Sequence, residues 1–183
     1  MVMPKIIIIR GNGNTTPQEN WFPYVEKELG GQVEVINKEF PDPDLARASY
    51  WLPFIKTLGA DEQTILVGHS SGAVAAMRFA EKHKILGSVL VAACYTDLGN
   101  EQEKVSGYFD TAWDWPAIRN NQRWLIQFAS TNDPYIPIAE ARYINQQLKT
   151  EYHEYADRGH FGADTGATTF PQLVESLKRK LKI

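Results

Sequence analysis

Short apolar runs recur along the chain, and patterns typical of helices lie between them. Runs that are mostly apolar cover residues 5–9 (KIIII), 64–67 (TILV), 87–92 and 124–128, and runs that alternate between polar and apolar residues cover 32–37 and 151–156, the last typical of an edge strand. Helical patterns cover residues 20–29, 45–58, 71–83, 139–148 and 170–181. Runs that are apolar throughout are typical of strands buried on both faces. The alternation of these runs with helical patterns therefore predicts a parallel sheet whose crossover helices cover both of its faces.

The predicted fold is an α/β sandwich of three layers. We expect about six mostly parallel strands in the order 2-1-3-4-5-6, one domain spanning residues 1–183, and no large lid domain. Pro53 should kink or divide the helix of residues 45–58. Residues 95–123 form the longest segment without clear periodicity, and a loop of that length could roof a pocket.

Composition excludes several classes of protein. The net charge is −3, so the chain lacks the basic excess that holds a phosphate backbone, and we expect no nucleic-acid partner. Its one cysteine, Cys94, allows no intrachain disulfide, which fits a reducing compartment. The start lacks signal-peptide features, and no apolar run is long enough to span a bilayer. We therefore expect a cytoplasmic protein without a membrane partner.

The strongest local motif is GHSSG at residues 68–72, between the apolar run TILV and an alanine-rich helical pattern. A strand, a sharp turn and a helix are the context of the G-x-S-x-G nucleophile elbow. Glycines stand two residues before and after Ser70, where side chains would collide with neighbouring backbone. Ser70 is therefore the candidate nucleophile. The alternative is a glycine-serine turn that has no catalytic role.

A nucleophilic serine needs a general base, and four histidines compete for that role. His69 lies inside the elbow, His83 lies near a helix end, and His153 lies within a predicted strand. His160 follows the last strand on a loop, which places it over the carboxyl edge of the sheet. We therefore predict that His160 is the base.

The orienting acid should lie between the serine and the histidine in sequence. Asp133 follows the apolar run of residues 124–128 on a turn that Pro134 and Pro137 make rigid. Asp97, which follows the preceding strand, is the rival, because some serine hydrolases take their acid from that place. We favour Asp133.

The first strand runs into RGNGN at residues 10–14. A dinucleotide fingerprint would need glycine at position 16, which is threonine, and no full P-loop is present, so a nucleotide-binding or flavodoxin-like protein is disfavoured. The loop instead suits an oxyanion hole formed by the backbone N–H groups of Asn12 and Ser71. Arg10 is either a partly buried, paired residue or a substrate contact. We expect no metal and no cofactor, because metal-ligand spacings are absent.

The chain resembles the retinoblastoma-binding protein 9 family, which are compact α/β-hydrolases, over nearly its whole length. The motifs that carry the resemblance are GNG at residues 11–13, FPDP at 40–43, WLPF at 51–54, GHSSGA at 68–73, TDLG at 96–99, SGYF at 106–109, DP at 133–134 and GHF at 159–161. The resemblance implies a serine hydrolase whose triad falls on Ser70, Asp133 and His160, the residues chosen above.

One departure from this family concerns a protein partner. The family's namesake is linked to the retinoblastoma protein through a short L-x-C-x-E motif. The matching residues 58–62 read LGADE, so Ala60 replaces the cysteine. We therefore do not expect this interaction for the chain.

Together these patterns predict a serine hydrolase that cleaves a small ester, amide or thioester through an acyl-enzyme. The alternative is a protein-binding scaffold on the same fold, whose catalysis is incidental or lost. Aromatic residues between positions 108 and 115 either line an apolar pocket or belong to the core. As tentative substrate contacts we select Trp113 from this segment and Phe161 beside the predicted base.

Overall fold

The computed structural model describes residues 3–183, and its centre is one parallel sheet of six strands. The strands are β1 (Lys5–Ile9), β2 (Glu34–Ile36), β3 (Thr64–His69), β4 (Gly87–Val91), β5 (Leu125–Ser130) and β6 (Glu151–Tyr155). Their spatial order is β2-β1-β3-β4-β5-β6, and every neighbouring pair is parallel. The predicted strand order and fold class are therefore confirmed.

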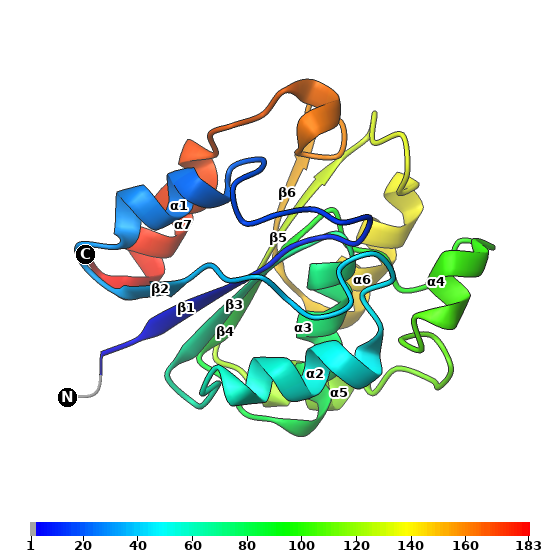
Figure 1. Cartoon of the computed structure of the whole chain (residues 1–183), viewed down its shortest axis with the longest axis horizontal. Coiled ribbons are helices and arrows are strands. Elements are labelled where there is room, and N and C mark those ends of the chain that lie inside the picture. Colours follow the sequence, from blue (N-terminus) through cyan, green and yellow to red (C-terminus); the bar gives the residue numbers. More distant parts are fainter. Residues whose placement is uncertain (1–2) are drawn as a thin grey trace.

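Helices cover both faces of this sheet, so the fold has three layers (Figure 1). They are α1 (Phe22–Leu29), α2 (Ala48–Thr57), α3 (Ser71–Lys82), α4 (Glu101–Val105), α5 (Trp115–Asn120), α6 (Ile138–Leu148) and α7 (Pro171–Leu181), with a short 3₁₀ turn η1 (Ala163–Thr165). Helices α1 and α7 pack on one face, whereas α2, α3, α5 and α6 pack on the other. Within residues 3–183 no helix is long and apolar enough to cross a membrane, and no large additional domain is present.

The first strand illustrates why the sheet forms its two cores. Ile6 and Ile8 face the core beneath α1 and α7, while Ile7 and Ile9 face the core beneath α2 and α3. All four side chains are at most 2% exposed. Burying each one contributes about 1.5–3 kcal/mol relative to exposure. A strand in the middle of a three-layer sandwich therefore has to be apolar on both faces, as β1 is.

Two sequence-based expectations need correction or completion. Pro53 does not divide its helix, because α2 runs without a break from Ala48 to Thr57. The buried residues Trp51 and Ile55 pack into the core on either side of Pro53, and this packing offsets the hydrogen bond that proline lacks. The segment of residues 95–123 is not a plain loop, because it contains α4 and α5.

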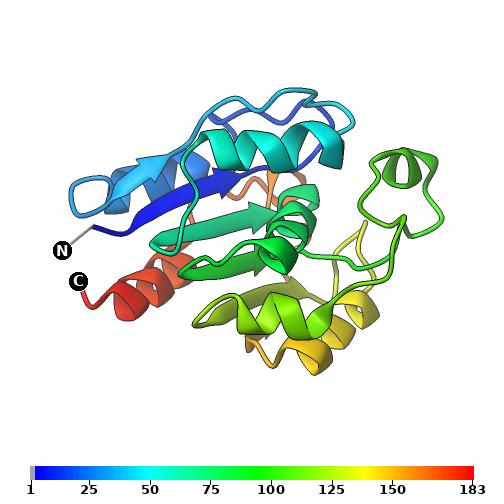
Figure 2. The same ribbon diagram turned by 90° about the horizontal axis from the view of Figure 1, so that it is seen from below.

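The strands all end at the same edge of the sheet, and the candidate residues follow these ends. In Figure 2 the strand arrowheads point toward the side of the molecule where α4 lies. Ser70 follows β3 directly, Asp133 follows β5, and His160 follows β6. Parallel strands thus bring together residues that are up to 90 positions apart in the sequence.

Candidate active site

The turn between β3 and α3 holds Ser70 in an uncommon backbone conformation. Ser70 has φ 55° and ψ −122°, a region that costs energy for a residue with a side chain. Its N–H donates to the carbonyl of Val91 at 2.9 Å, which ties the turn to the end of β4. The sharp turn leaves the Ser70 side chain at the start of α3, on the wall of a cavity.

The two glycines of the motif are required by close backbone contacts. A Cβ atom at Gly68 would lie 2.5 Å from the Ala73 nitrogen, and one at Gly72 would lie 2.5 Å from the Arg10 carbonyl oxygen. Real Cβ atoms do not approach backbone atoms so closely. The predicted steric reason for both glycines is therefore present in the structure.

The His160 side chain is hydrogen-bonded to Asp133 and not to the rival carboxylate, Asp97. The His160 Nδ1 atom lies 2.8 Å from Asp133 Oδ2, and the two side chains are 12% and 3% exposed. The other Asp133 oxygen accepts hydrogen bonds from the backbone N–H groups of Tyr135 and Ile136 at 2.8 and 3.0 Å. Asp97 instead accepts from a nearby backbone N–H. The carboxylate of Asp133 is thus fixed, with one oxygen aimed at the imidazole.

The loop that carries His160 is held by hydrogen bonds to its backbone. The side chain of Asp164 accepts from the His160 N–H at 2.8 Å, and the side chain of Asn132 accepts from the Gly159 N–H at 2.8 Å. The carbonyl of His160 lies 2.7 Å from the His69 Nε2 atom. Complete burial and the nearby His160 lower the pKa of His69 to about 3. His69 is therefore neutral and donates its Nε2–H to this carbonyl.

A cavity of about 600 Å³ opens beside Ser70 and His160. One part of its wall is apolar and comes from Leu98, Pro134, Tyr135 and Ile136. Another part is polar and comes from Asn12, Thr15, Asn100, Gln102 and Glu103. Helix α4 and the residue that caps it thus form part of the wall, which is how the segment of residues 95–123 reaches the site.

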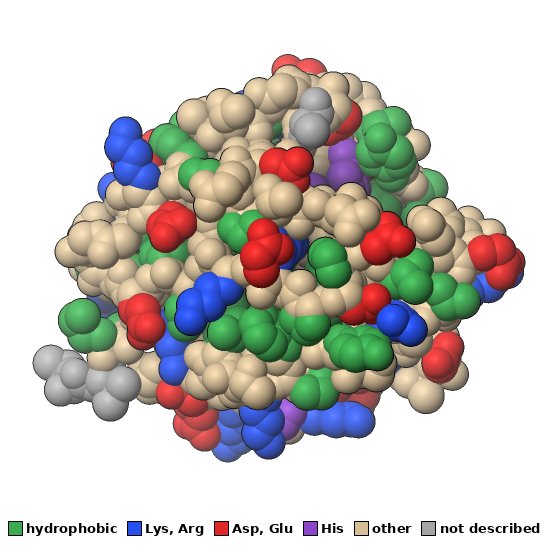
Figure 3. Space-filling view, in the orientation of Figure 1, with side chains coloured by type: hydrophobic (Ala, Val, Ile, Leu, Met, Phe, Trp, Pro, Cys, Tyr) green, Lys and Arg blue, Asp and Glu red, His purple; other side chains and the backbone are tan. Residues whose placement is uncertain are grey.

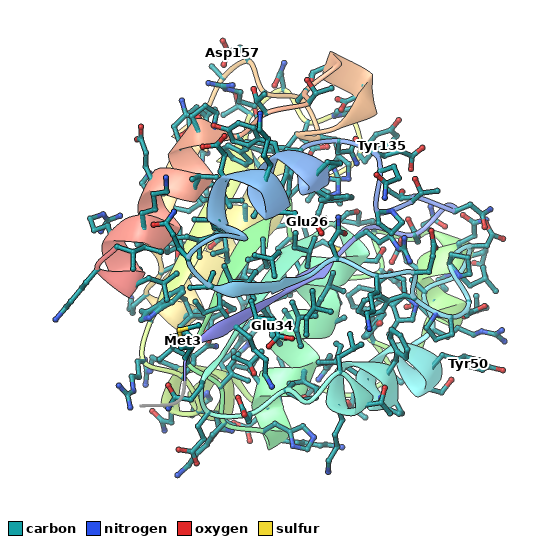
Figure 4. The ribbon with its side chains drawn as sticks, turned by 60° about the vertical axis from the view of Figure 1, so that its left-hand side comes forward. Met3, Glu26, Glu34, Tyr50, Tyr135 and Asp157 are labelled. Atoms are coloured by element: carbon teal, nitrogen blue, oxygen red, sulfur yellow. The ribbon has the colours of Figure 1, made fainter. Side chains whose placement is uncertain are left out.

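Tyr135 forms part of the rim of this cavity. Its side chain is 62% exposed, and its ring meets the His160 ring edge to face at a centroid distance of 5.0 Å. Figure 4 shows Tyr135 at the same end of the molecule as η1.

A second, smaller cavity of about 190 Å³ adjoins the first and shares His69, Tyr135 and His160 with it. On the face drawn in Figure 3, histidine atoms are visible in the upper half, with both acidic and hydrophobic side chains near them.

The backbone groups predicted to form an oxyanion hole also border this site. Asn12 lines the large cavity, and Ser71 is the first residue of α3. Within the described chain neither backbone N–H donates to another protein group. A Cβ atom at Gly11 would lie 3.3 Å from the Cβ atom of Ser70, so the loop after β1 packs closely against the elbow.

Three other sequence candidates lie away from the cavity. Arg10 is 2% exposed and pairs with Glu39 at 2.9 Å. This fits the expectation of a buried, paired residue rather than that of a substrate contact. Trp113 lies on the guanidinium of Arg78, 3.6 Å from ring centroid to Cζ, and packs against the core. Phe161 points into the core beneath α1 and α7. Trp113 and Phe161 are therefore not brought to the site.

Comparisons with known proteins identify the family of this chain. The model of the family described as "Serine hydrolase" matches residues 6–179. The chain is 42% identical to serine hydrolase RBBP9 of Rattus norvegicus over 182 residues, which cover 97% of this chain and 95% of that protein. The chain belongs to the serine hydrolase family. The resemblance drawn from its motifs is thereby confirmed.

Solved structures place this serine hydrolase among the α/β-hydrolases. The ydeN gene product of B. subtilis superposes with a TM-score of 0.89 at 25% identity, over 99% of this chain and 100% of that one. The Pyrococcus furiosus esterase PF2001 superposes with a TM-score of 0.68 at 15% identity, over 98% and 81% of the two chains. The second similarity is one of fold alone.

The segment that matches the partner-binding motif of the family's namesake forms a tight turn in this serine hydrolase. Residues 58–62 lie between α2 and β3. The Asp61 carboxylate accepts hydrogen bonds from the Gln63 N–H at 3.0 Å and the Thr64 hydroxyl at 2.8 Å. That this chain does not bind the retinoblastoma protein stays a prediction from Ala60.

Proposed function

We propose that this hydrolase cleaves a small ester, amide or thioester, with Ser70 as nucleophile, His160 as base and Asp133 as orienting acid. The observation that carries the proposal is the 2.8 Å contact between His160 Nδ1 and Asp133, beside a cavity that Ser70 and His160 both line. A serine, an imidazole and a buried carboxylate at one sheet edge are the groups that acyl transfer needs.

The contact with Asp133 defines the tautomer of His160 in this mechanism. A carboxylate is an acceptor, so the Nδ1 atom carries the proton and the Nε2 atom is free to act as base. The Ser70 hydroxyl attacks the substrate carbonyl while the Nε2 atom takes its proton, and Asp133 stabilises the imidazolium. The imidazolium then returns the proton to the leaving group. Water repeats the sequence and releases the acyl group from Ser70.

The tetrahedral intermediate needs donors for its negative oxygen. In the proposal these are the backbone N–H groups of Asn12 and Ser71, on either side of the elbow. The N–H of Ser71 lies at the start of α3, where the helix dipole also favours negative charge. One such donor is typically worth about 3–4 kcal/mol of transition-state stabilisation.

The cavity supports a small substrate with both apolar and polar parts. A volume of about 600 Å³ falls within the usual range for small-molecule sites, and its wall contains both apolar and polar side chains. The esterase among the structural neighbours makes ester cleavage a reasonable reaction to test first.

The test is covalent labelling with a fluorophosphonate, which reacts with activated serines. The wild-type protein and the Ser70→Ala and His160→Ala variants are treated with the probe, and the adduct is located by peptide mass spectrometry. We expect labelling on Ser70 in the wild type and none in either variant. A folded wild-type protein that does not label would contradict the proposed triad and favour the scaffold alternative.

A further inference from the structure

Hydrogen bonds fix both the carbonyl and the side chain of Asn12, the residue whose N–H is one of the two proposed oxyanion donors. The Thr15 hydroxyl donates to the Asn12 carbonyl at 2.9 Å. The Asn12 side chain donates to the carboxylate of Glu103, on α4, at 2.9 Å. The N–H of Asn12 donates to no other protein group within residues 3–183, so it can meet an oxygen of the substrate.

The two N–H groups that follow Asn12 bind a neighbouring turn. The Gly13 N–H donates to the Asp44 carbonyl at 2.9 Å, and the Asn14 N–H donates to the Pro43 carbonyl at 3.0 Å. Gly13 and Asn14 have left-handed backbone, with φ 69° and 61°, which glycine and asparagine adopt more readily than most residues. Figures 1 and 2 show this loop beside the connection from β2 to α2. The turn therefore sets the direction of the chain directly after Asn12.

The turn that accepts these bonds, residues 41–47, is itself fixed by Asp42. The Asp42 carboxylate accepts hydrogen bonds from the Arg47 backbone N–H at 3.0 Å and from the Arg47 guanidinium at 2.8 and 3.0 Å. The Asp42 carbonyl accepts from the Ala46 N–H at 2.8 Å. The Trp51 indole donates to the Pro41 carbonyl at 2.7 Å. Two motifs that the proposed mechanism does not use, FPDP and WLPF, thus combine to hold the 41–47 turn.

We propose that Thr15 and Asp42 are positioning residues, which hold the Asn12 N–H toward the oxyanion of the reaction. The inference rests on the proposed function and adds two residues to it. A donor stabilises an oxyanion well only when it is in place before the charge develops. A misplacement of about 1 Å can cost about 100-fold in rate. Thr15 acts on the Asn12 peptide directly, whereas Asp42 acts through the 41–47 turn.

The first test removes one hydroxyl and keeps the branched shape of the side chain. Thr15→Val leaves the Asn12 carbonyl without this donor, whereas Thr15→Ser keeps a hydroxyl. With p-nitrophenyl butyrate as substrate, we expect kcat to fall about 10-fold in Thr15→Val and to recover in Thr15→Ser. KM should change little, because the lost stabilisation belongs to the transition state.

Thr57→Val is the matched control for this test. The Thr57 hydroxyl also donates to the carbonyl three residues before it, that of Phe54, at 2.7 Å. Thr57 is exposed at the end of α2 and does not line the cavity, so this variant should keep the wild-type kcat.

The second test removes the carboxylate that fixes the 41–47 turn. Asp42→Ala is compared with Glu154→Ala, because each variant removes a carboxylate that binds an arginine through two hydrogen bonds. Glu154 binds Arg142 at 3.0 and 2.6 Å, on β6 and away from Asn12. We expect kcat to fall about 10- to 100-fold in Asp42→Ala and to stay at the wild-type value in Glu154→Ala. The thermal transition of each variant reports its folding.

A pair of inhibitors separates positioning of the oxyanion donor from a general disturbance of the site. With 1,1,1-trifluorohexan-2-one, Ser70 adds to the carbonyl carbon, its proton passes to His160, and the carbonyl oxygen becomes an oxyanion. Hexan-2-one binds as a neutral ketone. Thr15→Val and Asp42→Ala should weaken binding of the trifluoromethyl ketone about as much as they lower kcat, and they should leave binding of hexan-2-one unchanged.

Three results would overturn the inference: an unchanged kcat in Thr15→Val, no recovery in Thr15→Ser, or equal weakening of the two ketones. If Asp42→Ala behaves like Glu154→Ala, the role of Asp42 is wrong. If the wild type labels at Ser70 while Thr15→Val keeps its kcat, the proposed function holds and this inference alone fails. A wild-type protein that neither labels nor cleaves the ester would contradict both.

Discussion

The Nε2 atom of His69 lies 2.7 Å from the backbone carbonyl oxygen of His160, although 91 residues separate them in the sequence. His69 is the second residue of the elbow motif, so one contact ties the turn that carries the nucleophile to the loop that carries the base. The ring of His69 is itself fixed between Trp21 and Phe22, with centroid distances of 6.0 Å to both. We infer that His69 is a positioning residue.

His69→Phe should impair catalysis although it changes none of the three residues of the proposed triad. Phenylalanine keeps an aromatic ring but leaves the His160 carbonyl without its donor, and an unsatisfied buried group costs about 1–3 kcal/mol. We expect kcat/KM for p-nitrophenyl butyrate to fall about 10- to 100-fold, mainly through kcat, because the base is displaced. Steady-state kinetics measure this change.

The control for this prediction is His69→Gln. The glutamine side chain can still donate an N–H to the same carbonyl, so this variant should recover most of the lost kcat. If phenylalanine and glutamine reduce kcat equally, or if phenylalanine does not reduce it, the positioning role is wrong.

Asp133→Asn should affect catalysis far more than stability. Asparagine can still accept the hydrogen bonds of the Tyr135 and Ile136 N–H groups, but its amide favours the wrong tautomer of His160. In triads of this kind the change lowers kcat about 10⁴-fold. Asp97→Asn removes the rival carboxylate and should stay within a few-fold of the wild type. The reverse pattern in a kcat measurement would move the acid to Asp97.

The fold could be predicted from the sequence because its signals are local. The inner strands β1, β3, β4 and β5 are short, mostly apolar runs, whereas the edge strands β2 and β6 alternate. The longer helices show their periodicity directly, as α3 and α7 do. Helices α4 and α5 were not predicted, because five and six residues are too few to show a repeat of 3.6. The second of these begins at Trp115-Pro116 after a capping Asp114, a signal that could have revealed it.

The site could be predicted only where residue type and chain order are decisive. Ser70, Asp133 and His160 follow strand ends, and the parallel sheet brings those ends together. The contacts of His69 and Glu103 each join residues 91 positions apart, and no spacing rule reveals such pairs. Phe161 was misleading because it follows His160 directly, yet its side chain packs into the core.

Gly72→Ala tests the steric reason for the elbow motif. The new methyl group would meet the carbonyl oxygens of Ile9 and Arg10, which belong to backbone at the end of β1 and cannot rotate away. We expect a loss of about 3 kcal/mol in the free energy of unfolding, at the upper end for overpacking. Gly31→Ala is the control, because its Cβ would meet nothing within 4 Å, and it should change stability by less than about 1 kcal/mol. Urea denaturation compares the two, and equal stabilities would refute the steric argument.

The stability of the protein should fall with acidification before the carboxylates titrate. Burial lowers the pKa of His69 from 6.5 to about 3, so the folded state leaves this imidazole neutral where the unfolded chain protonates it. The unfolded state therefore binds the extra proton as the pH falls below 6.5, and stability decreases in that direction. One such group gives a slope of about 1.4 kcal/mol per pH unit once the unfolded histidine is fully protonated.

His69→Gln removes this group, so the slope of unfolding free energy against pH between 6 and 5 should decrease by about 1 kcal/mol per unit. Burial also lowers the pKa of His83, which lies far from the site and contributes to the slope in both proteins. Glu151, whose pKa the side chain of Arg179 lowers to about 2, responds only below its usual 4.5 and does not disturb this range. Urea unfolding at several pH values measures the slopes. If the two proteins give parallel curves of unfolding free energy against pH, His69 accepts a proton in the folded state. The donation of Nε2–H to the His160 carbonyl would then no longer imply a neutral imidazole.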